Sequence, residues 1–352
     1  KKHVTASVIG GNGTITPTDT IVDYGTTATL AVNADAANGY AIETITCGDS
    51  VLTFTDNTTS YNYDVVSVTS DTAVVATFAL REYTIDVTAG LNGTITPDDT
   101  VITYGGDAHY TITADPCYAI TSLTVDGVEV AITDPTTMTY DFTNVVDHHT
   151  LNAEFTILTY NMTSAASANG TVTPSETVDC GSDFTYNVEA DAGYHIANVV
   201  IDGVTTTFLN NEVTFDTTFT NITANHNLEA TFVINGYTVT ATADANGTIT
   251  PEGDSIVNYG DNVEYTVASN ACYHLADLTV NGISVMADMV GNTYTLNNVV
   301  ADVTVEATYA INTYQMSATY DNTLGTVSEA TANCGDSYTY TIAANEGYHI
   351  ES

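Results

Sequence analysis

Basic residues are almost absent from this chain of 352 residues. The only bases are Lys1, Lys2 and Arg81, against 43 acidic residues, and the formal net charge is −40. Charge-driven binding to nucleic acid is therefore close to excluded, because almost nothing can neutralise phosphates and release their counterions. Anionic membrane surfaces are disfavoured for the same reason. We expect no nucleic-acid partner.

Tryptophan is absent, and so are long apolar runs. No run approaches the ~18 apolar residues that a membrane-spanning helix needs, so we expect no membrane span. A helix-forming composition rich in Ala, Leu, Glu and Lys is also missing. The chain instead has abundant Thr, Val and Ile and 23 Tyr. Such β-branched and aromatic side chains favour strands, so we predict an all-β protein.

A six-residue block, N-G-T-I/V-T-P, recurs at steps of 77 to 80 residues, and recurrence at a near-constant step indicates a repeat architecture. Complete copies lie at residues 12–17, 92–97, 169–174 and 246–251, and a weaker copy lies at 324–328. We therefore divide the chain into repeats at residues 1–80, 81–157, 158–234, 235–311 and 312–352, the last holding only the first half of a repeat.

Each repeat reads as short strands separated by turns. In the second repeat we predict strands at residues 83–89, 94–96, 109–114, 139–142 and 150–155, with a hairpin at 123–130. Asn92-Gly93 is interpreted as a tight turn because both residues tolerate positive φ. About seven strands in such a length favour a small β-sandwich or a grasp-like sheet.

The joints between repeats are short and regular. The closing aromatic of one repeat precedes the opening Tyr of the next by five positions each time, as in Phe78 to Tyr83 and Phe155 to Tyr160. No Gly/Ser-rich or Pro-rich linker intervenes. We expect neighbouring repeats to be fixed at one angle and stacked head to tail in a linear array.

Five features recur together: an opening Tyr, N-G-T-I-T-P, Y-G, then G-Y about a dozen residues on, and a closing A-T-F. Across all five repeats this set resembles the divergent internalin-B-type repeats of bacterial surface proteins. The Trp usual in that family five residues after G-Y is replaced here by Ile45, Leu123, Val199 and Leu278. The resemblance implies tandem extracellular modules used as stalks, spacers or adhesive surfaces, and it carries no catalytic residues.

Four of the five cysteines occupy two repeated positions. Cys117 and Cys272 replace the Gly of G-Y, whereas Cys180 and Cys334 replace the Tyr of Y-G. The two positions bracket one strand of about 12 residues, which spans roughly 40 Å. A disulfide within one repeat is therefore excluded, because bridged Cα atoms lie only ~6 Å apart.

Head-to-tail stacking brings the G-Y end of one repeat against the Y-G end of the next. The four junctions then pair Gly39 with Tyr104, Cys117 with Cys180, Gly193 with Tyr259, and Cys272 with Cys334. We predict that the two cysteine pairs form disulfides between adjacent repeats, which requires an oxidising compartment and favours an extracellular or cell-surface location. The alternative is that these cysteines are buried thiols acting as small hydrophobes in a reducing compartment.

Cys47 falls outside this scheme and is either a free thiol or paired with another chain.

We find no catalytic constellation or motif, so we predict no enzyme, no catalytic residue and no cofactor. Zinc is disfavoured because the sequence has no C-x-x-C pair, and adjacent His148-His149 should point to opposite faces of a strand. His195, His274 and His349 share one place directly after the G-Y or C-Y pair, which favours a shared structural role or a role at the junction over metal binding. Calcium at oxygen-rich turns between repeats stays open as an alternative.

We predict an extracellular structural protein that forms a stiff stalk or filament, with a cell-surface adhesin or carbohydrate-binding region as the alternative. The last repeat stops after its G-Y pair. We expect its missing strands to come from continuation in a longer chain or from a neighbouring chain during self-association. N-x-T sequons also permit glycans, as at Asn57, Asn161 and Asn221.

Overall fold

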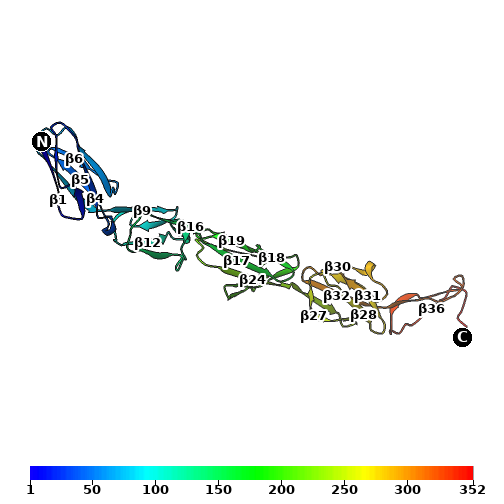
Figure 1. Cartoon of the computed structure of the whole chain (residues 1–352). Helices are drawn as coiled ribbons and strands as arrows, with labels where there is room; N and C mark the ends of the chain where they lie inside the picture. The colour runs from blue at the N-terminus through cyan, green and yellow to red at the C-terminus, as the bar shows by residue number, and fades with distance from the viewer. Residues whose placement is uncertain (352) are drawn as a thin grey trace. The chain divides into compact units, whose positions relative to one another are not determined.

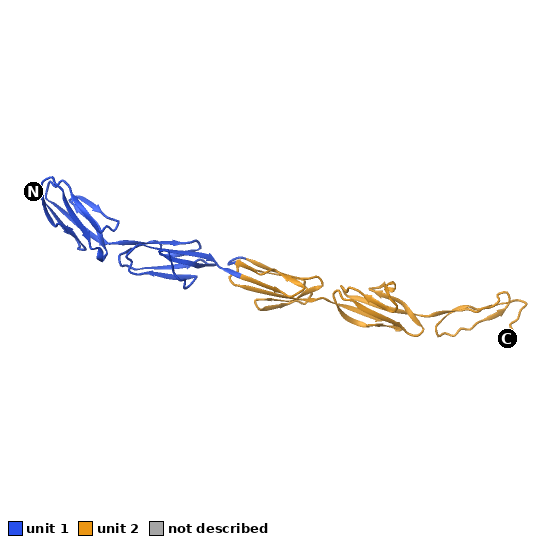
Figure 2. Cartoon of the chain, turned by 45° about the vertical axis from the view of Figure 1, so that its right-hand side comes forward, with its two compact units in different colours: residues 1–160, 179–182 blue, residues 161–178, 183–352 orange. Residues whose placement is uncertain are grey.

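The computed structural model describes residues 1–351 and consists of β-strands and turns. The chain divides into two compact units, one formed by residues 1–160 and 179–182, the other by residues 161–178 and 183 onward (Figure 2). Within the described residues, helical structure is limited to two short 3-10 turns, η1 (Ala36–Asn38) and η2 (Met286–Asp288).

The first two repeats have eight strands each. Several of these strands are labelled in Figure 1. The first set is β1 (Lys2–Val8), β2 (Gly13–Thr16), β3 (Asp19–Val22), β4 (Ala28–Ala34), β5 (Tyr40–Cys47), β6 (Ser50–Thr53), β7 (Ser60–Val65) and β8 (Thr72–Leu80). The second is β9 (Glu82–Ala89), β10 (Gly93–Thr96), β11 (Thr100–Thr103), β12 (Ala108–Ala114), β13 (Tyr118–Val125), β14 (Val128–Glu129), β15 (Thr137–Phe142) and β16 (His149–Ile157).

The same series of eight strands recurs twice more and then begins a third time. The third repeat has β17 (Thr159–Ala166), β18 (Gly170–Val172), β19 (Glu176–Asp179), β20 (Phe184–Ala190), β21 (Tyr194–Ile201), β22 (Val204–Thr207), β23 (Thr214–Phe219) and β24 (His226–Ile234). The fourth has β25 (Gly236–Ala243), β26 (Gly247–Thr250), β27 (Gly253–Asn258), β28 (Val263–Ser269), β29 (Tyr273–Val280), β30 (Ile283–Ser284), β31 (Thr293–Leu296) and β32 (Val303–Ile311). The last strands are β33 (Thr313–Met316), β34 (Gly325–Val327), β35 (Ala330–Asn333) and β36 (Ile342–Ala344).

Each complete repeat folds into two open sheets. In the first repeat the five-stranded sheet has the order β3-β1-β8-β5-β6 and the three-stranded sheet has the order β2-β4-β7, and the next three repeats have the same orders. The first and last strands, β1 and β8, are parallel neighbours. Because these two strands run in the same direction, the chain enters a repeat at one end and leaves it at the other.

The core of each complete repeat lies between its two sheets. In the second repeat it joins Ile85 and Leu151 of the larger sheet to Tyr110 and Ile112 of the smaller one, and all four are fully buried. The residues at the place of the family's Trp are fully buried as well: Ile45, Leu123, Val199 and Leu278. These positions therefore belong to the core, with aliphatic side chains in place of the larger ring.

A close contact between an aromatic ring and a glycine connects the two sheets. A Cβ atom added to Gly93 would lie 2.3 Å from the ring of Phe155 in β16, and the pairs Gly13–Phe78, Gly170–Phe232 and Gly247–Tyr309 have the same arrangement. The sequence interpretation of Asn92-Gly93 was therefore only partly right. Asn92 has φ of 70°, but Gly93 does not have a positive φ and is needed because the ring of Phe155 lies against it.

Two details of the second repeat differ from the sequence prediction. The repeat has eight strands, because the short β11 at the edge of the larger sheet carries no clear alternation and was missed. The strand between the Y-G and G-Y positions, β12, has 7 residues instead of about 12, because turns occupy both of its flanks.

We predict that Gly93→Ala destabilises the second repeat by about 1–3 kcal/mol, because the new methyl group must displace the ring of Phe155. Urea unfolding followed by tyrosine fluorescence measures the loss. Thr94→Ala, at the exposed neighbouring position, should change stability little. The cost of Gly93→Ala should also shrink in a Phe155→Leu background, and equal costs in both backgrounds would contradict the contact.

Candidate functional site

The junctions between repeats are the candidate functional site, and a single linker residue lies at the centre of each. The linker residues are Arg81, Leu158, Asn235 and Asn312. Each is the only residue between the last strand of one repeat and the first strand of the next. These four residues were not predicted from the sequence, although their constant spacing of 77 residues is a signal that could have identified them.

Each linker residue forms the same two backbone hydrogen bonds. At the first junction, Arg81 donates its N–H to the carbonyl of Gly39 and accepts from the N–H of Tyr104, both at 2.8 Å. The other three junctions repeat this arrangement with distances of 2.7 to 2.8 Å. The linker thus joins the G-Y position of one repeat to the Y-G position of the next, and both its N–H and its carbonyl are hydrogen-bonded.

Two junctions are closed by a tyrosine ring on a glycine. Gly39 has φ of 85°, and a Cβ atom there would lie 2.2 Å from Cδ1 of Tyr104. Gly193 has φ of 84° and meets Tyr259 at the same distance. The left-handed backbone favours glycine at both places, and the closeness of the ring requires it.

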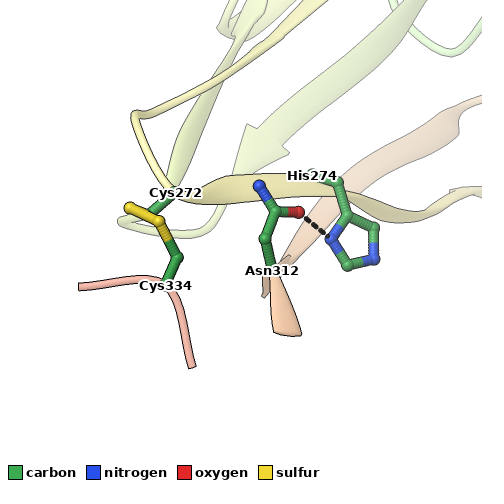
Figure 3. Close-up of a disulfide and its surroundings, with 4 residues drawn as sticks. All are labelled: Cys272, His274, Asn312 and Cys334. Carbon is green, nitrogen blue, oxygen red and sulfur yellow. Dashed lines mark hydrogen bonds between the residues drawn. A yellow bond between two sulfur atoms is a disulfide. The ribbon is translucent and has the colours of Figure 1, made fainter. Parts of the chain in front are cut away.

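The other two junctions are closed by disulfides. The structure joins Cys117 to Cys180 and Cys272 to Cys334, each with Cα atoms 5.4 Å apart (Figure 3 shows the second pair). Cys117 and Cys272 have φ of 70° and 71°, the left-handed conformation that Gly39 has at the first junction. A cystine therefore takes the place of the tyrosine–glycine contact without a change in the backbone bonds of the linker.

Histidines brace the two junctions whose linker is asparagine. Nδ1 of His195 lies 2.6 Å from Oδ1 of Asn235, and Nδ1 of His274 lies 2.8 Å from Oδ1 of Asn312 (Figure 3). An amide oxygen only accepts, so Nδ1 must carry the proton. The first two repeats have Ala at the histidine position and a different linker residue. Histidine and asparagine therefore occur together in this chain, and these histidines act through the linker.

Arg81, the only arginine of the chain, is held in the first junction. Its guanidinium lies 4.8 Å from the ring centroid of Tyr104 and 6.0 Å from that of Tyr83, and Nη2 donates to the carbonyl of Ala36 at 2.9 Å. Such cation–π contacts stabilise by about 0.5–2 kcal/mol each. Arg81 thus adds a side-chain contact to the backbone bonds of this junction.

Cys47 lies far from the junction positions and bonds to no other cysteine among residues 1–351. It ends β5 and packs partly buried against the core of the first repeat, at the place that Val125 holds in the second. Burial, together with the neighbouring Cys47, raises the pKa of Tyr63. Cys47 therefore lies where the second repeat has the apolar Val125, and its pairing with another chain stays a prediction.

The adjacent histidines of the second repeat have separate partners and do not share one site. His148 accepts from the N–H of Thr84 at 2.9 Å, whereas His149 lies 2.7 Å from Asp126. The hydrogen bond to His149 is the main cause that holds the pKa of Asp126 below its ordinary value. Within residues 1–351, no three His, Cys, Asp or Glu side chains are grouped as metal ligands. Over the same residues, no helix has the length and apolarity to cross a bilayer.

The profile of the divergent InlB B-repeat domain matches this chain four times in tandem, at residues 3–82, 83–158, 160–236 and 237–313. These matches span most of the sequence, and the chain therefore belongs to this family. The predictions of an internalin-B-type family and of an all-β fold in tandem repeats are confirmed. A search of curated protein sequences gives no match.

Solved structures resemble the chain only distantly. The TIE protein of Bacillus anthracis is 11% identical, with 84% of this chain and 74% of that protein covered and a TM-score of 0.29. The I9-I11 tandem of titin is 7% identical (88% and 97% covered, TM-score 0.11). The major pilin protein T-13 of Streptococcus pyogenes is 11% identical (88% and 95% covered, TM-score 0.11). At these scores the similarities carry no argument about fold or function.

We predict that Gly39→Ala opens the first junction, because its methyl group cannot coexist with the ring of Tyr104. Trypsin reports this opening, since Arg81 is the only basic residue beyond Lys1 and Lys2. Cleavage of a transiently opened site follows the population of the open form, so the rate after Arg81 should rise at least about tenfold.

Gly25→Ala is the matched control for this experiment. Gly25 has φ of 80°, close to that of Gly39, but a Cβ atom there would meet nothing within 4 Å. The control therefore introduces the same backbone strain without the clash at the junction. Equal cleavage rates for the two variants would show that the contact between Gly39 and Tyr104 does not hold the junction closed.

We expect the isolated, unreduced protein to have one reactive thiol, at Cys47, and five after reduction. Alkylation in denaturant followed by intact mass counts these thiols. Digestion with a protease that cleaves at acidic residues should then release cross-linked peptides joining Cys117 to Cys180 and Cys272 to Cys334. Five labels without reductant, or a different pairing, would contradict the disulfide assignment.

Proposed function

We propose that this array of divergent InlB B-repeats is a structural part of an extracellular or cell-surface protein, where it forms a stiff stalk or filament. The observation that carries the proposal is the junction, which repeats the same backbone bonds four times around a one-residue linker. InlB-like repeats and disulfides are typical of proteins outside the cell. The proposal requires no catalysis and no cofactor.

The junctions support stiffness because they leave little freedom between neighbouring repeats. A flexible joint needs several residues whose backbone can rotate. Here β8 ends at Leu80 and β9 begins at Glu82, and Arg81 between them has both backbone groups bonded. Bending at this junction would break those bonds and separate the ring of Tyr104 from Gly39.

A second candidate function is adhesion to carbohydrate, and specific exposed rings favour it. Tyr24 is 70% exposed and Tyr61 is 38% exposed, and aromatic faces of this kind stack on sugar rings. Most other tyrosines serve the core or the junctions, as Tyr110 and Tyr104 do. We expect a glycan array to give no binding if the chain acts only as a stalk, and binding that Tyr24→Ala removes if it acts as an adhesin.

We predict that the distance between dyes at Leu91 and Leu209 is narrowly distributed in the oxidised protein and broadens on reduction. Both side chains are exposed, at 86% and 88%, and they lie in the repeats that Cys117 and Cys180 join. Dyes attached through unnatural amino acids leave the cysteines intact, and single-molecule energy transfer measures the distribution.

The control pair places dyes at Leu209 and Ile283, across the junction of Gly193 and Tyr259. Ile283 is 72% exposed, and this junction contains no cystine, so its distribution should be narrow in both redox states. Broad distributions for both pairs in the oxidised protein would refute the stiff stalk. Antibody labelling of intact cells that produce the protein tests the location separately, and absence of surface labelling would refute it.

A further inference from the structure

We propose that the two disulfides limit how far this chain can lengthen under tension, because the residues that each disulfide encloses cannot be pulled out into the stretched chain. The inference deepens the proposed function, since a stalk carries tension between its ends. It follows from two features, which are the order of the strands within a repeat and the positions of the cysteines along the chain. Each feature is independent of where the protein resides.

The first feature concerns how tension passes through one repeat. The first and last strands are parallel neighbours in every complete repeat: β1 with β8, β9 with β16, β17 with β24, and β25 with β32. Tension pulls the first strand backward and the last strand forward along their own axes. All the hydrogen bonds between the two strands are then loaded together, whereas a hairpin pulled at its open end loses its bonds one at a time.

The core opposes sliding of these two strands. Val4 in β1 and Val74 in β8 are fully buried, and so are Ile85 in β9 and Leu151 in β16. A slip by one residue would turn these side chains from the core to the solvent face. Each repeat pulled through both strands should therefore yield in one cooperative step instead of a gradual extension.

The second feature is the path of covalent bonds. When Cys117 is bonded to Cys180, tension leaves the second repeat at Cys117 and enters the third at Cys180. The bypassed segment contains β13 to β19, and it includes β16 and β17. Neither the second nor the third repeat is then pulled through both of its parallel strands, because one strand of each pair lies inside the closed loop.

The bond between Cys272 and Cys334 has the same effect on the fourth repeat. Its loop contains β29 to β35 and therefore includes β32, the partner of β25. Among the four complete repeats, only the first keeps both parallel strands on the tensed path. In the oxidised chain, the first repeat is thus the one that can release its full length.

The withheld length is large. The loops span 63 and 62 residue steps, which correspond to about 220 Å of extended chain each at roughly 3.5 Å per residue. Together they remove about 440 Å, on the order of a third of the fully extended chain. Reduction restores this length. A dithiol supplies two electrons and two protons to each disulfide, which becomes two thiols, and the dithiol becomes a disulfide.

Single-molecule force spectroscopy on the full chain, held by handles at its two ends, tests the inference. The contour length of the fully stretched protein should increase by about 440 Å when dithiothreitol is added. The double variant Cys117→Gly/Cys180→Tyr should gain about 220 Å without reductant and a further 220 Å with it. This variant copies the residues that the chain itself uses at its first junction, Gly39 and Tyr104.

Cys47→Ser is the control and should leave both contour lengths unchanged, because Cys47 is bonded to no other cysteine among residues 1–351. The readout remains valid for a variant that folds poorly, since a fully stretched chain has no folded structure. Equal contour lengths with and without reductant would overturn the proposal. The two proposals can fail separately. If the contour length changes as predicted but the dyes report flexible junctions, or antibodies find no surface protein, the proposed function is rejected and this inference stands.

Discussion

The backbone bonds of the linker residue are the constraint on which the rest of the architecture depends. Arg81 donates its N–H to the carbonyl of Gly39 in one repeat and accepts from the N–H of Tyr104 in the next. The other three linker residues form the equivalent bonds. These bonds require that the G-Y turn of one repeat and the Y-G turn of the next arrive at the same place. The antiparallel pairs on either side of the linker ensure this, because Leu80 of β8 lies opposite Tyr40 of β5, and Glu82 of β9 lies opposite Thr103 of β11.

The period of the sequence was informative about the junctions because it aligns positions that lie far apart along the chain. Cys117 and Cys180 could be proposed as partners because each occupies a repeated place and the two places flank a joint. The all-β fold was predictable for a similar reason, since strand-forming residues alternate throughout. Aligning the repeats reveals which residues contact each other only where the same contact recurs in several repeats.

Contacts between distant segments were harder to predict. Gly93 looked like a turn residue because Asn-Gly is a strong local signal, whereas its actual requirement comes from Phe155, which is remote in sequence. The linker was overlooked because its side chain varies from Arg81 to Leu158 to Asn235, and only its backbone is used in the same way each time. Because only the backbone of the linker is used, residues of different types can occupy it, and no residue type in the sequence marks the position.

The two kinds of junction differ in energy but not in backbone geometry. Cys117 holds a left-handed conformation that costs a residue with a side chain about 1–3 kcal/mol, and Gly39 avoids that cost. In the chain-entropy model, closing a loop of 63 steps contributes about 4 kcal/mol of stability, so the disulfide more than offsets the strain. The tyrosine of the other junctions contributes through noncovalent contact alone. An exchange of Gly and Tyr for two cysteines therefore converts a noncovalent junction into a covalent one that lasts until the disulfide is reduced, while the linker bonds are the same in both.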